Sequence, residues 1–182
     1  TVKYEKNVNA ETAKISVCGI NPYSGCKNVE FEIAPISINP AISAIENMTY
    51  TGVALTPSIT VYNGGSLLEV SNYTVEYANN LNAGTASVTV NMNGNYVGSA
   101  AAIFTIEKAT PVISQNPKAR DVLIGEALAS SDLSGGISDV EGSFAWKKPE
   151  MIPVLENEGY AVEFIPTDAN NYNSVEIVVP IK

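Results

Sequence analysis

The sequence contains no histidine, and this absence removes several kinds of chemistry. Histidine is the commonest general base near neutral pH and the commonest zinc ligand. A Ser-His or Cys-His nucleophile therefore cannot be built from this chain. Charged residues are also scarce, at 16% of 182 residues compared with about 25% in an average soluble domain. These shortages favour a binding or structural role over catalysis, and we expect no enzyme activity and no cofactor.

Basic residues and long apolar runs are scarce as well. Lys and Arg number 10 against 19 Asp and Glu, which gives a formal net charge of −9. An acidic chain repels phosphate, so we expect no nucleic-acid partner. The longest purely apolar run, Ala100 to Phe104, is far shorter than the ~20 residues of a membrane-spanning helix, so we expect no membrane insertion. With 45% hydrophobic residues the chain can still bury a core, which excludes wholesale disorder.

Apolar and polar residues alternate in several short runs. Residues 73–77 read Tyr-Thr-Val-Glu-Tyr, and residues 85–90 and 175–181 follow a similar pattern. Successive side chains of a strand point to opposite faces, so this period of two predicts half-buried antiparallel strands. The turn sequence at 63–65, Asn-Gly-Gly, predicts a sharp hairpin. Many short strands separated by Gly, Asn and Pro indicate an all-β fold of sandwich type.

The chain contains an internal repeat. Residues 1–33 match residues 74–106 without a gap, with 13 identical pairs among the 33 positions. The identities fall at inward strand positions and at turns, a pattern that is typical of an array of similar modules. A third, weaker copy near the C-terminus places Tyr172 after an Asn-rich turn, as Tyr23 and Tyr96 are placed in the first two copies.

Proline-bearing segments follow the first two copies, and proline both stiffens a linker and cannot donate to a strand ladder. We therefore expect three parts: residues 1–35 as the C-terminal half of a module, in the form of a hairpin, residues 36–108 as a complete module, and residues 109–182 as a second complete module of another type. A lone hairpin is marginally stable in water. Its partner strands either lie upstream or belong to the next module, and we slightly favour packing on that module.

Several motifs of the two complete modules resemble those of a known family. In the first they are Tyr50-Thr51-Gly52, Ala54-Leu55-Thr56-Pro57, Val61-Tyr62-Asn63-Gly64, Asn72-Tyr73-Thr74-Val75 and Gly94-Asn95-Tyr96. In the second they are Lys108-Ala109-Thr110-Pro111, Leu133-Ser134-Gly135-Gly136, Gly142-Ser143-Phe144-Ala145-Trp146 and Phe164-Ile165-Pro166-Thr167-Asp168. On these residues the chain resembles the bacterial immunoglobulin-like repeats of exported surface proteins and adhesins.

The resemblance implies tandem immunoglobulin-like β-sandwich modules outside a bacterium, at the cell surface or secreted. It implies a non-catalytic spacer or adhesin stalk, and it carries over no catalytic residue. The partners would be neighbouring domains of the same parent chain, together with a host or matrix glycan or protein. The alternative is a carbohydrate- or protein-binding module, accessory to a secreted enzyme. Because the sequence starts with Thr1 and shows no leader pattern, we expect a piece of a longer, processed chain.

Cys18 and Cys26 are the only cysteines, and they flank a turn between two predicted strands. Cross-strand neighbours have Cβ atoms about 4.5–5.5 Å apart, close to the separation that a disulfide needs. A disulfide would suit an exported chain and would stabilise the half-module. The alternative is a pair of free thiols in a reducing setting.

Four aromatic residues are candidates for structural roles. Trp146 is either a sugar-stacking platform or a core anchor, and we favour the core. The turn tyrosines Tyr23, Tyr96 and Tyr172 recur at one place in the repeat, which suggests a packing role with the hydroxyl bonded to backbone.

One further cluster carries oxygen ligands, and its residues are Asp168, Asn170, Asn171 and Asn173. Calcium prefers six to eight oxygens, several of them from carboxylates. A single aspartate is too few, and local turn chemistry explains the segment better. We therefore predict no metal site.

Overall fold

The computed structural model describes every residue from Thr1 to Lys182. It consists of short strands with two 3-10 helices, η1 (Val70–Asn72) and η2 (Leu128–Ser130). The predicted all-β class is confirmed. Neither helix has the length and apolar character needed to cross a membrane.

The strands are short because turn residues interrupt them often. In the first half of the chain they are β1 Val2–Glu5, β2 Thr12–Cys18, β3 Cys26–Glu32, β4 Ile36–Ser37, β5 Ala41–Ile42, β6 Met48–Thr49, β7 Val61–Asn63, β8 Ser66–Leu67, β9 Tyr73–Ala78 and β10 Gly84–Met92. In the second half they are β11 Tyr96–Val97, β12 Ser99–Glu107, β13 Ile113–Gln115, β14 Lys118–Ala119, β15 Leu133–Ser134, β16 Ile137–Ser138, β17 Gly142–Trp146, β18 Tyr160–Pro166 and β19 Val175–Val179. The alternating runs of the sequence therefore do form strands, as β9, β10 and β19.

The chain divides into two compact units. One comprises Thr1–Glu46, Thr56–Asn80 and Thr85–Phe104, and the other comprises Asn47–Leu55, Leu81–Gly84 and Thr105–Lys182. Strands β10 and β12 continue from one unit into the other.

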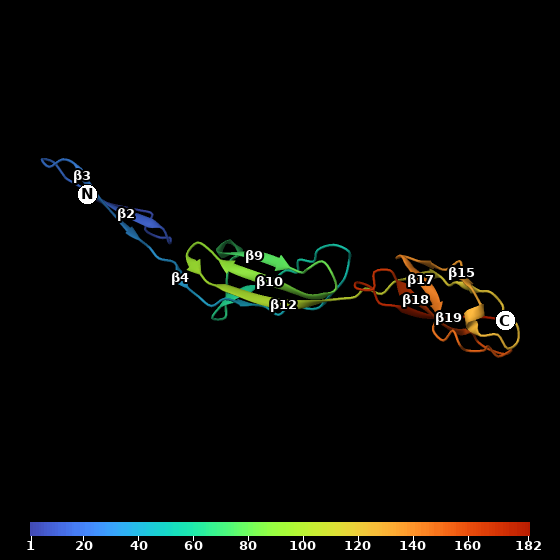
Figure 1. The fold of residues 1–182 in the computed structure, drawn as a ribbon. Helices are drawn as coiled ribbons and strands as arrows, with labels where there is room; N and C mark the ends of the chain where they lie inside the picture. The colour runs from blue at the N-terminus through green and yellow to red at the C-terminus, as the bar shows by residue number, and fades with distance from the viewer. The chain divides into compact units, whose positions relative to one another are not determined.

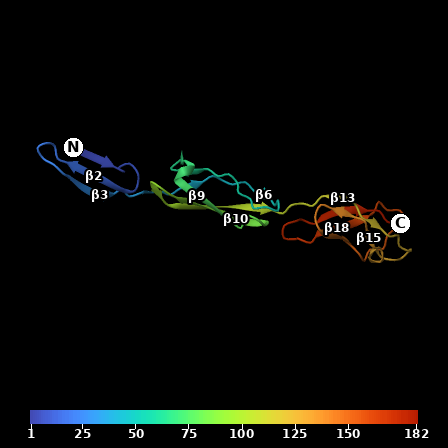
Figure 2. The ribbon, with the colours of Figure 1, turned by 90° about the horizontal axis from the view of Figure 1, so that it is seen from above.

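The first sheet has the order β1-β2-β3, with antiparallel neighbours. Figure 2 shows β2 and β3 beside each other near the N-terminus. The predicted hairpin is therefore wrong in one respect, because β1 adds a third strand. Val2 pairs with Val17 in this sheet, and Val75 pairs with Val90 between β9 and β10. Each position i of β1 and β2 thus has the register of position i + 73 in β9 and β10, so for these strands the sequence repeat is also a repeat of strand pairing.

The middle sheet has the order β6-β12-β10-β9, and a small sheet has the order β5-β7-β8. Strands β9, β10 and β12 run alongside one another in Figure 1. Strands β7 and β8 form the predicted hairpin, since Asn63 pairs with Ser66 across Gly64 and Gly65. Both glycines have positive φ, at 55° and 88°, as the tight two-residue turn requires.

One core cluster joins these two sheets. Val61 on β7 and Val90 on β10 are both fully buried, and they pack together with the buried Tyr73 at the start of β9. Partly buried residues around them are Ile42, Ile59, Leu68, Val75 and Met92. Two sheets that share a core in this way are consistent with a β-sandwich.

The C-terminal part contains the sheet β17-β18-β19 and the pairs β13-β16 and β14-β15. Its buried core consists of Leu128, Trp146, Val162, Val179 and Ile181. The aromatic rings of Phe144 and Phe164 add a tilted contact, with centroids 5.0 Å apart. A Cβ at Gly142 would lie 2.4 Å from the Phe164 ring, so only glycine fits at the start of β17.

Most of the apolar face of the first sheet is exposed, although Ala13 on the same face is fully buried. Val17 and Val29 are 52% and 62% exposed, although both point to the side where a sandwich would have its core. The packing of residues 1–35 on the next module that the sequence slightly favours therefore does not take place through this face.

Candidate functional site

Each unit contains one asparagine side chain that joins a turn to a loop. In the first unit Asn95 lies directly before β11, opposite the loop between β1 and β2. Its Oδ1 accepts a hydrogen bond from the backbone N–H of Ala10 at 2.7 Å, and its Nδ2 donates to Oδ1 of Asn9 at 3.0 Å. This set of bonds is the Asn95 contact.

The second unit contains the same arrangement around Asn171. Its Oδ1 accepts a hydrogen bond from the N–H of Ala83 at 2.7 Å, and its Nδ2 donates to Oδ1 of Asn82 at 3.2 Å. Asn82 and Ala83 are the repeat equivalents of Asn9 and Ala10. The Asn171 contact therefore uses the same chemical groups as the Asn95 contact.

Backbone pairing accompanies both asparagines. The N–H of Ile36 donates to the carbonyl oxygen of Asn95 at 2.8 Å, and the N–H of Ala109 donates to that of Asn171 at 2.9 Å. Each bond lies next to a parallel pairing with the following tyrosine, Tyr96 with Ile36 and Tyr172 with Ala109. Positions 36 and 109 also differ by one repeat length, so the whole arrangement is made twice.

An asparagine suits this place because its amide offers an acceptor and two donors together. Asn171 is only 6% exposed, so its polar atoms depend on protein partners rather than water. Its Nδ2 also donates to Oδ2 of Asp168 at 2.8 Å, which fixes the orientation of the amide. Of the four candidate calcium ligands, Asp168 and Asn171 are therefore engaged with each other, and Asn173 donates to the carbonyl oxygen of Lys108 and to Oγ1 of Thr110.

The Asn171 contact has additional partners. The rings of Tyr50 and Tyr172 meet edge to face, with centroids 5.4 Å apart. Nζ of Lys108 donates to the carbonyl oxygen of Ala169 at 2.6 Å. Burial of the ring contact adds to the hydrogen bonds and makes this the more extensive of the two contacts.

The turn tyrosines differ from one another in the structure. Tyr172 packs on Tyr50 and Tyr96 is half-buried, whereas Tyr23 is 77% exposed. None of the three hydroxyls bonds to backbone, so that part of the prediction is wrong, as is a packing role for Tyr23. Pro22 occupies the repeat position of Asn95, and a proline has no amide side chain with which to draw the turn onto a neighbouring loop.

Trp146 lies in the C-terminal core and is 9% exposed. Its indole Nε1–H donates to the carbonyl oxygen of Ser131 at 2.9 Å. This geometry is that of a core anchor whose polar atom is satisfied, and the ring has no free face for stacking a sugar.

Cys18 and Cys26 face each other at the end of the β2-β3 pair, with Cα atoms 4.1 Å apart, and they form a disulfide. The bond closes the turn that contains Pro22 and Tyr23. It therefore stabilises the end of the first sheet that lies away from the Asn95 contact.

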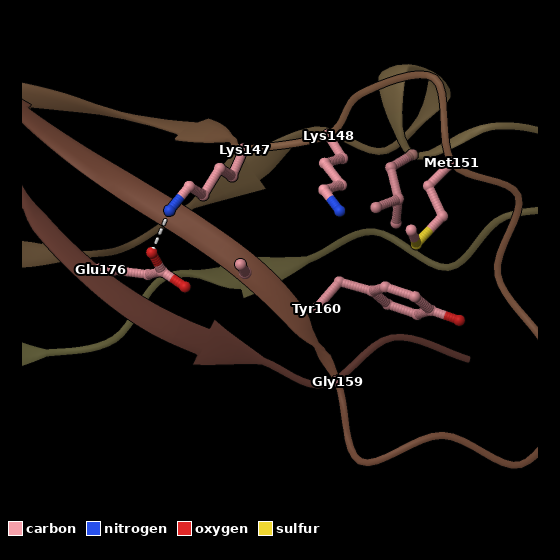
Figure 3. Close-up of a pocket in the computed structure, with 8 residues that line it drawn as sticks. Lys147, Lys148, Met151, Gly159, Tyr160 and Glu176 are labelled. Atoms are coloured by element: carbon pink, nitrogen blue, oxygen red, sulfur yellow. Dashed lines mark hydrogen bonds and ion pairs between the residues drawn. The ribbon is translucent and has the colours of Figure 1, made fainter.

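A cavity of about 320 Å³ opens on the C-terminal part (Figure 3). Its lining residues are Leu128, Lys147, Lys148, Met151, Gly159, Tyr160, Ala161 and Glu176. Lys147 pairs with Glu176, and the hydrogen bond that its ammonium donates to that carboxylate raises the pKa of Lys147 above its ordinary value. The Tyr160 hydroxyl accepts the N–H of Val154 at 2.9 Å. The cavity thus offers one further cation, Lys148, beside an apolar wall, a set suited to binding rather than to acid–base chemistry.

Neither a protein-family model nor a curated protein matches the chain.

Proposed function

We propose that this chain is a non-catalytic spacer, or adhesin stalk, of a bacterial cell-surface protein, built from immunoglobulin-like modules in tandem. The observation that carries the proposal is the contact that occurs twice, around Asn95 and around Asn171. A repeated contact between a turn and the loop of the preceding copy is what a spacer needs, because it limits bending at every junction by the same means. The motifs that resemble exported bacterial repeats support the location outside the cell.

The work of such a spacer is mechanical. Each junction combines two side-chain hydrogen bonds with a short backbone pairing, and proline near the junctions stiffens the linker. The disulfide supports an oxidising environment. The low content of basic residues, 10 of 182, and the net charge of −9 reduce non-specific adhesion to nucleic acid and anionic surfaces.

NMR relaxation of backbone ¹⁵N nuclei tests whether the chain is a semi-rigid spacer. The unchanged chain should give nearly equal rotational correlation times for residues 36–108 and residues 109–182. Asn171→Ala should separate the two values, whereas Asn170→Ala, an exposed neighbour, should leave them equal. Correlation times that already differ in the unchanged chain would refute a semi-rigid spacer. Protease accessibility of the parent protein on intact cells would test the surface location.

The alternative is a carbohydrate- or protein-binding module, accessory to a secreted enzyme, and one feature favours it. The cavity beside Lys148 and Tyr160 is large enough for part of a small ligand. A glycan array with the unchanged chain and with Lys148→Ala would decide, since binding that is lost in the variant would establish this function. The buried Trp146 argues against a sugar platform and leaves the spacer as the better-supported proposal.

A further inference from the structure

The first sheet has one polar and one apolar face. Its polar face contains Lys3, Glu5, Thr12, Lys14, Ser16, Asn28, Glu30 and Glu32, as the register of the strands requires. Its apolar face contains Val2, Tyr4, Ala13, Ile15, Val17, Val29 and Phe31, and Lys27, which pairs with Val17, lies on the same side near the end of the sheet. Ion pairing occurs on the polar face, where Nζ of Lys14 lies 3.8 Å from Oε2 of Glu5. Water can hydrogen-bond to the side chains of the polar face, but it gives the apolar side chains of the other face no such stabilisation.

Most large side chains of this apolar face are open to solvent. The exposed fractions are 54% for Val2, 59% for Tyr4, 52% for Val17, 62% for Val29 and 39% for Phe31. Contiguous apolar surface on a strand face marks an interaction site, since soluble proteins seldom leave such a surface uncovered.

The middle sheet shows what these positions look like when they are covered. Val17 corresponds to Val90, which is fully buried, and Phe31 corresponds to Phe104, which is 3% exposed. The strand register is identical in the two places. The sequence of the face is thus that of a sandwich core, and the difference in exposure comes from what lies over it.

The cover of the middle sheet comes from the residues that precede β9. Val61 on β7 packs against Val90. The hydroxyl of Tyr77, which is the equivalent of Tyr4, donates to the carbonyl oxygen of Pro57 at 2.5 Å. The covering layer leads directly through Tyr73 into the residue that corresponds to Thr1.

We propose that the apolar face of the first sheet is a docking surface for a β layer of the kind that residues 36–73 form, joined directly to Thr1. The identical register of β1-β2 and β9-β10 means that such a layer meets Val17 as Val61 meets Val90. Its continuity with β1 reproduces the order of the middle part, which is why a covalently joined layer is favoured over a second copy of the chain. The inference follows from the repeat and the exposed face, and it does not depend on the spacer role.

The test is the full chain extended before Thr1 by a second copy of residues 36–73. Methyl NMR with a soluble paramagnetic agent measures the accessibility of Val17 and Val29. In the extended chain the paramagnetic broadening of the Val17 methyl signals should fall to that of Val90, and the broadening of the Val29 methyl signals should decrease. Contacts should appear between Val17 and the valine of the extension that copies Val61. The matched control carries Asp in place of that valine, and its Val17 and Val29 should stay as accessible as in the unextended chain.

Two results would overturn the proposal. The first is an extended chain in which Val17 and Val29 stay accessible while the methyls of Val90 stay protected, since the protected Val90 shows that the rest of the chain is folded. The second is an unextended chain that at pH 7.5, where its net charge of −9 is expected to keep copies apart, sediments as a dimer with Val17 and Val29 already protected, which would make a second copy the occupant.

Discussion

At the scale of single residues, Asn95 and Asn171 occupy equivalent positions but differ in environment. Both accept a backbone N–H at 2.7 Å, yet only Asn171 is also held by an aspartate and lies beside an edge-to-face tyrosine pair. Burial raises the cost of an unsatisfied amide, because water cannot replace the missing partner. The loss of the same side chain should therefore matter more at position 171 than at position 95.

The amide of Ala83 reports on this difference. In Asn171→Ala the N–H of Ala83 loses its acceptor at Oδ1, and leaving this partly buried donor unpaired should cost about 1 kcal/mol or more. We expect the Ala83 amide to exchange with deuterium about tenfold faster or more. Asn170→Ala should leave this rate unchanged. Equal rates in the Asn171→Ala variant and the unchanged chain would mean that the contact does not form in solution.

Tyr77 predicts a dependence of stability on alkaline pH. Burial raises the pKa of Tyr77 above its ordinary 10.0. The unfolded chain therefore loses this proton first, so the stabilising contribution is complete below about pH 10 and is lost as the pH rises through the folded-state pKa. Above pH 10 the midpoint temperature of thermal unfolding should fall more steeply with pH in the unchanged chain than in Tyr77→Phe, because the phenylalanine cannot ionise. If the midpoint temperature depends on pH in the same way in both proteins, the burial of this hydroxyl is contradicted.

At the scale of elements, the sheet β1-β2-β3 and the strands β9, β10 and β12 show that one pattern can give two environments. The alternation of Val2, Val17 and Val29 is that of a half-buried strand, and the structure forms those strands in the expected register. Whether the apolar side becomes a core depends on a second layer, which the local pattern does not contain. Three strands without such a layer depend more on the crosslink at their end.

Val90 and Val17 form a matched pair for testing this point. They hold the same register position, but Val90 is fully buried and Val17 is 52% exposed. Val90→Ala should lower the free energy of unfolding by about 2 kcal/mol, since it leaves a cavity. Val17→Ala should change it by no more than ~0.5 kcal/mol, as for most exposed sites. Denaturant unfolding, followed by hydrogen–deuterium exchange of individual peptides, would measure the change in the free energy of unfolding for both variants. An equal change in the two variants would mean that the first sheet is covered in solution.

The disulfide should stabilise the first sheet alone. Cys18 and Cys26 are 8 residues apart, and closure of a loop of this length restricts the unfolded chain by about 2–3 kcal/mol. Reduction should speed amide exchange in β1, β2 and β3 and leave β17, β18 and β19 unaffected. The double variant Cys18→Ser, Cys26→Ser should show the faster exchange without reductant. If amide exchange in the first sheet does not change on reduction, contacts other than the disulfide stabilise this sheet.

The sequence predicted the elements better than the contacts between distant segments. Alternation predicted β9, β10 and β19, because a period of two is a local property. The third strand of the first sheet, β1, could also have been predicted, because Val2 is the repeat equivalent of Val75, which lies in a predicted strand. The asparagine contacts join residues that are 85 to 89 positions apart, and no local pattern reports such a pairing. The one sequence signal for these contacts was that Asn9 and Ala10 are identical to Asn82 and Ala83. These residues lie in a loop, where strand packing does not require identical side chains.

At the scale of the whole molecule, charge and the exposed apolar face oppose each other. The net charge of −9 at neutral pH keeps copies of the chain apart, and the isoelectric point lies near 4.4. Near that pH the repulsion vanishes, while the apolar face of the first sheet is unchanged. Association of copies through this face is therefore expected in mild acid and not at neutral pH.

Sedimentation velocity at pH 7.5 and near pH 4.4 would measure this association. Val29→Lys places a charge in the middle of the apolar face and should abolish the association near pH 4.4, because the charge would have to lose its water. Asn28→Lys makes the same change of net charge one residue away, on the polar face, and should associate as the unchanged chain does. If the two variants behave alike, net charge alone governs the association. If only Val29→Lys stays monomeric, the uncovered strand face is the surface through which the copies meet, as its burial in the middle sheet leads us to expect.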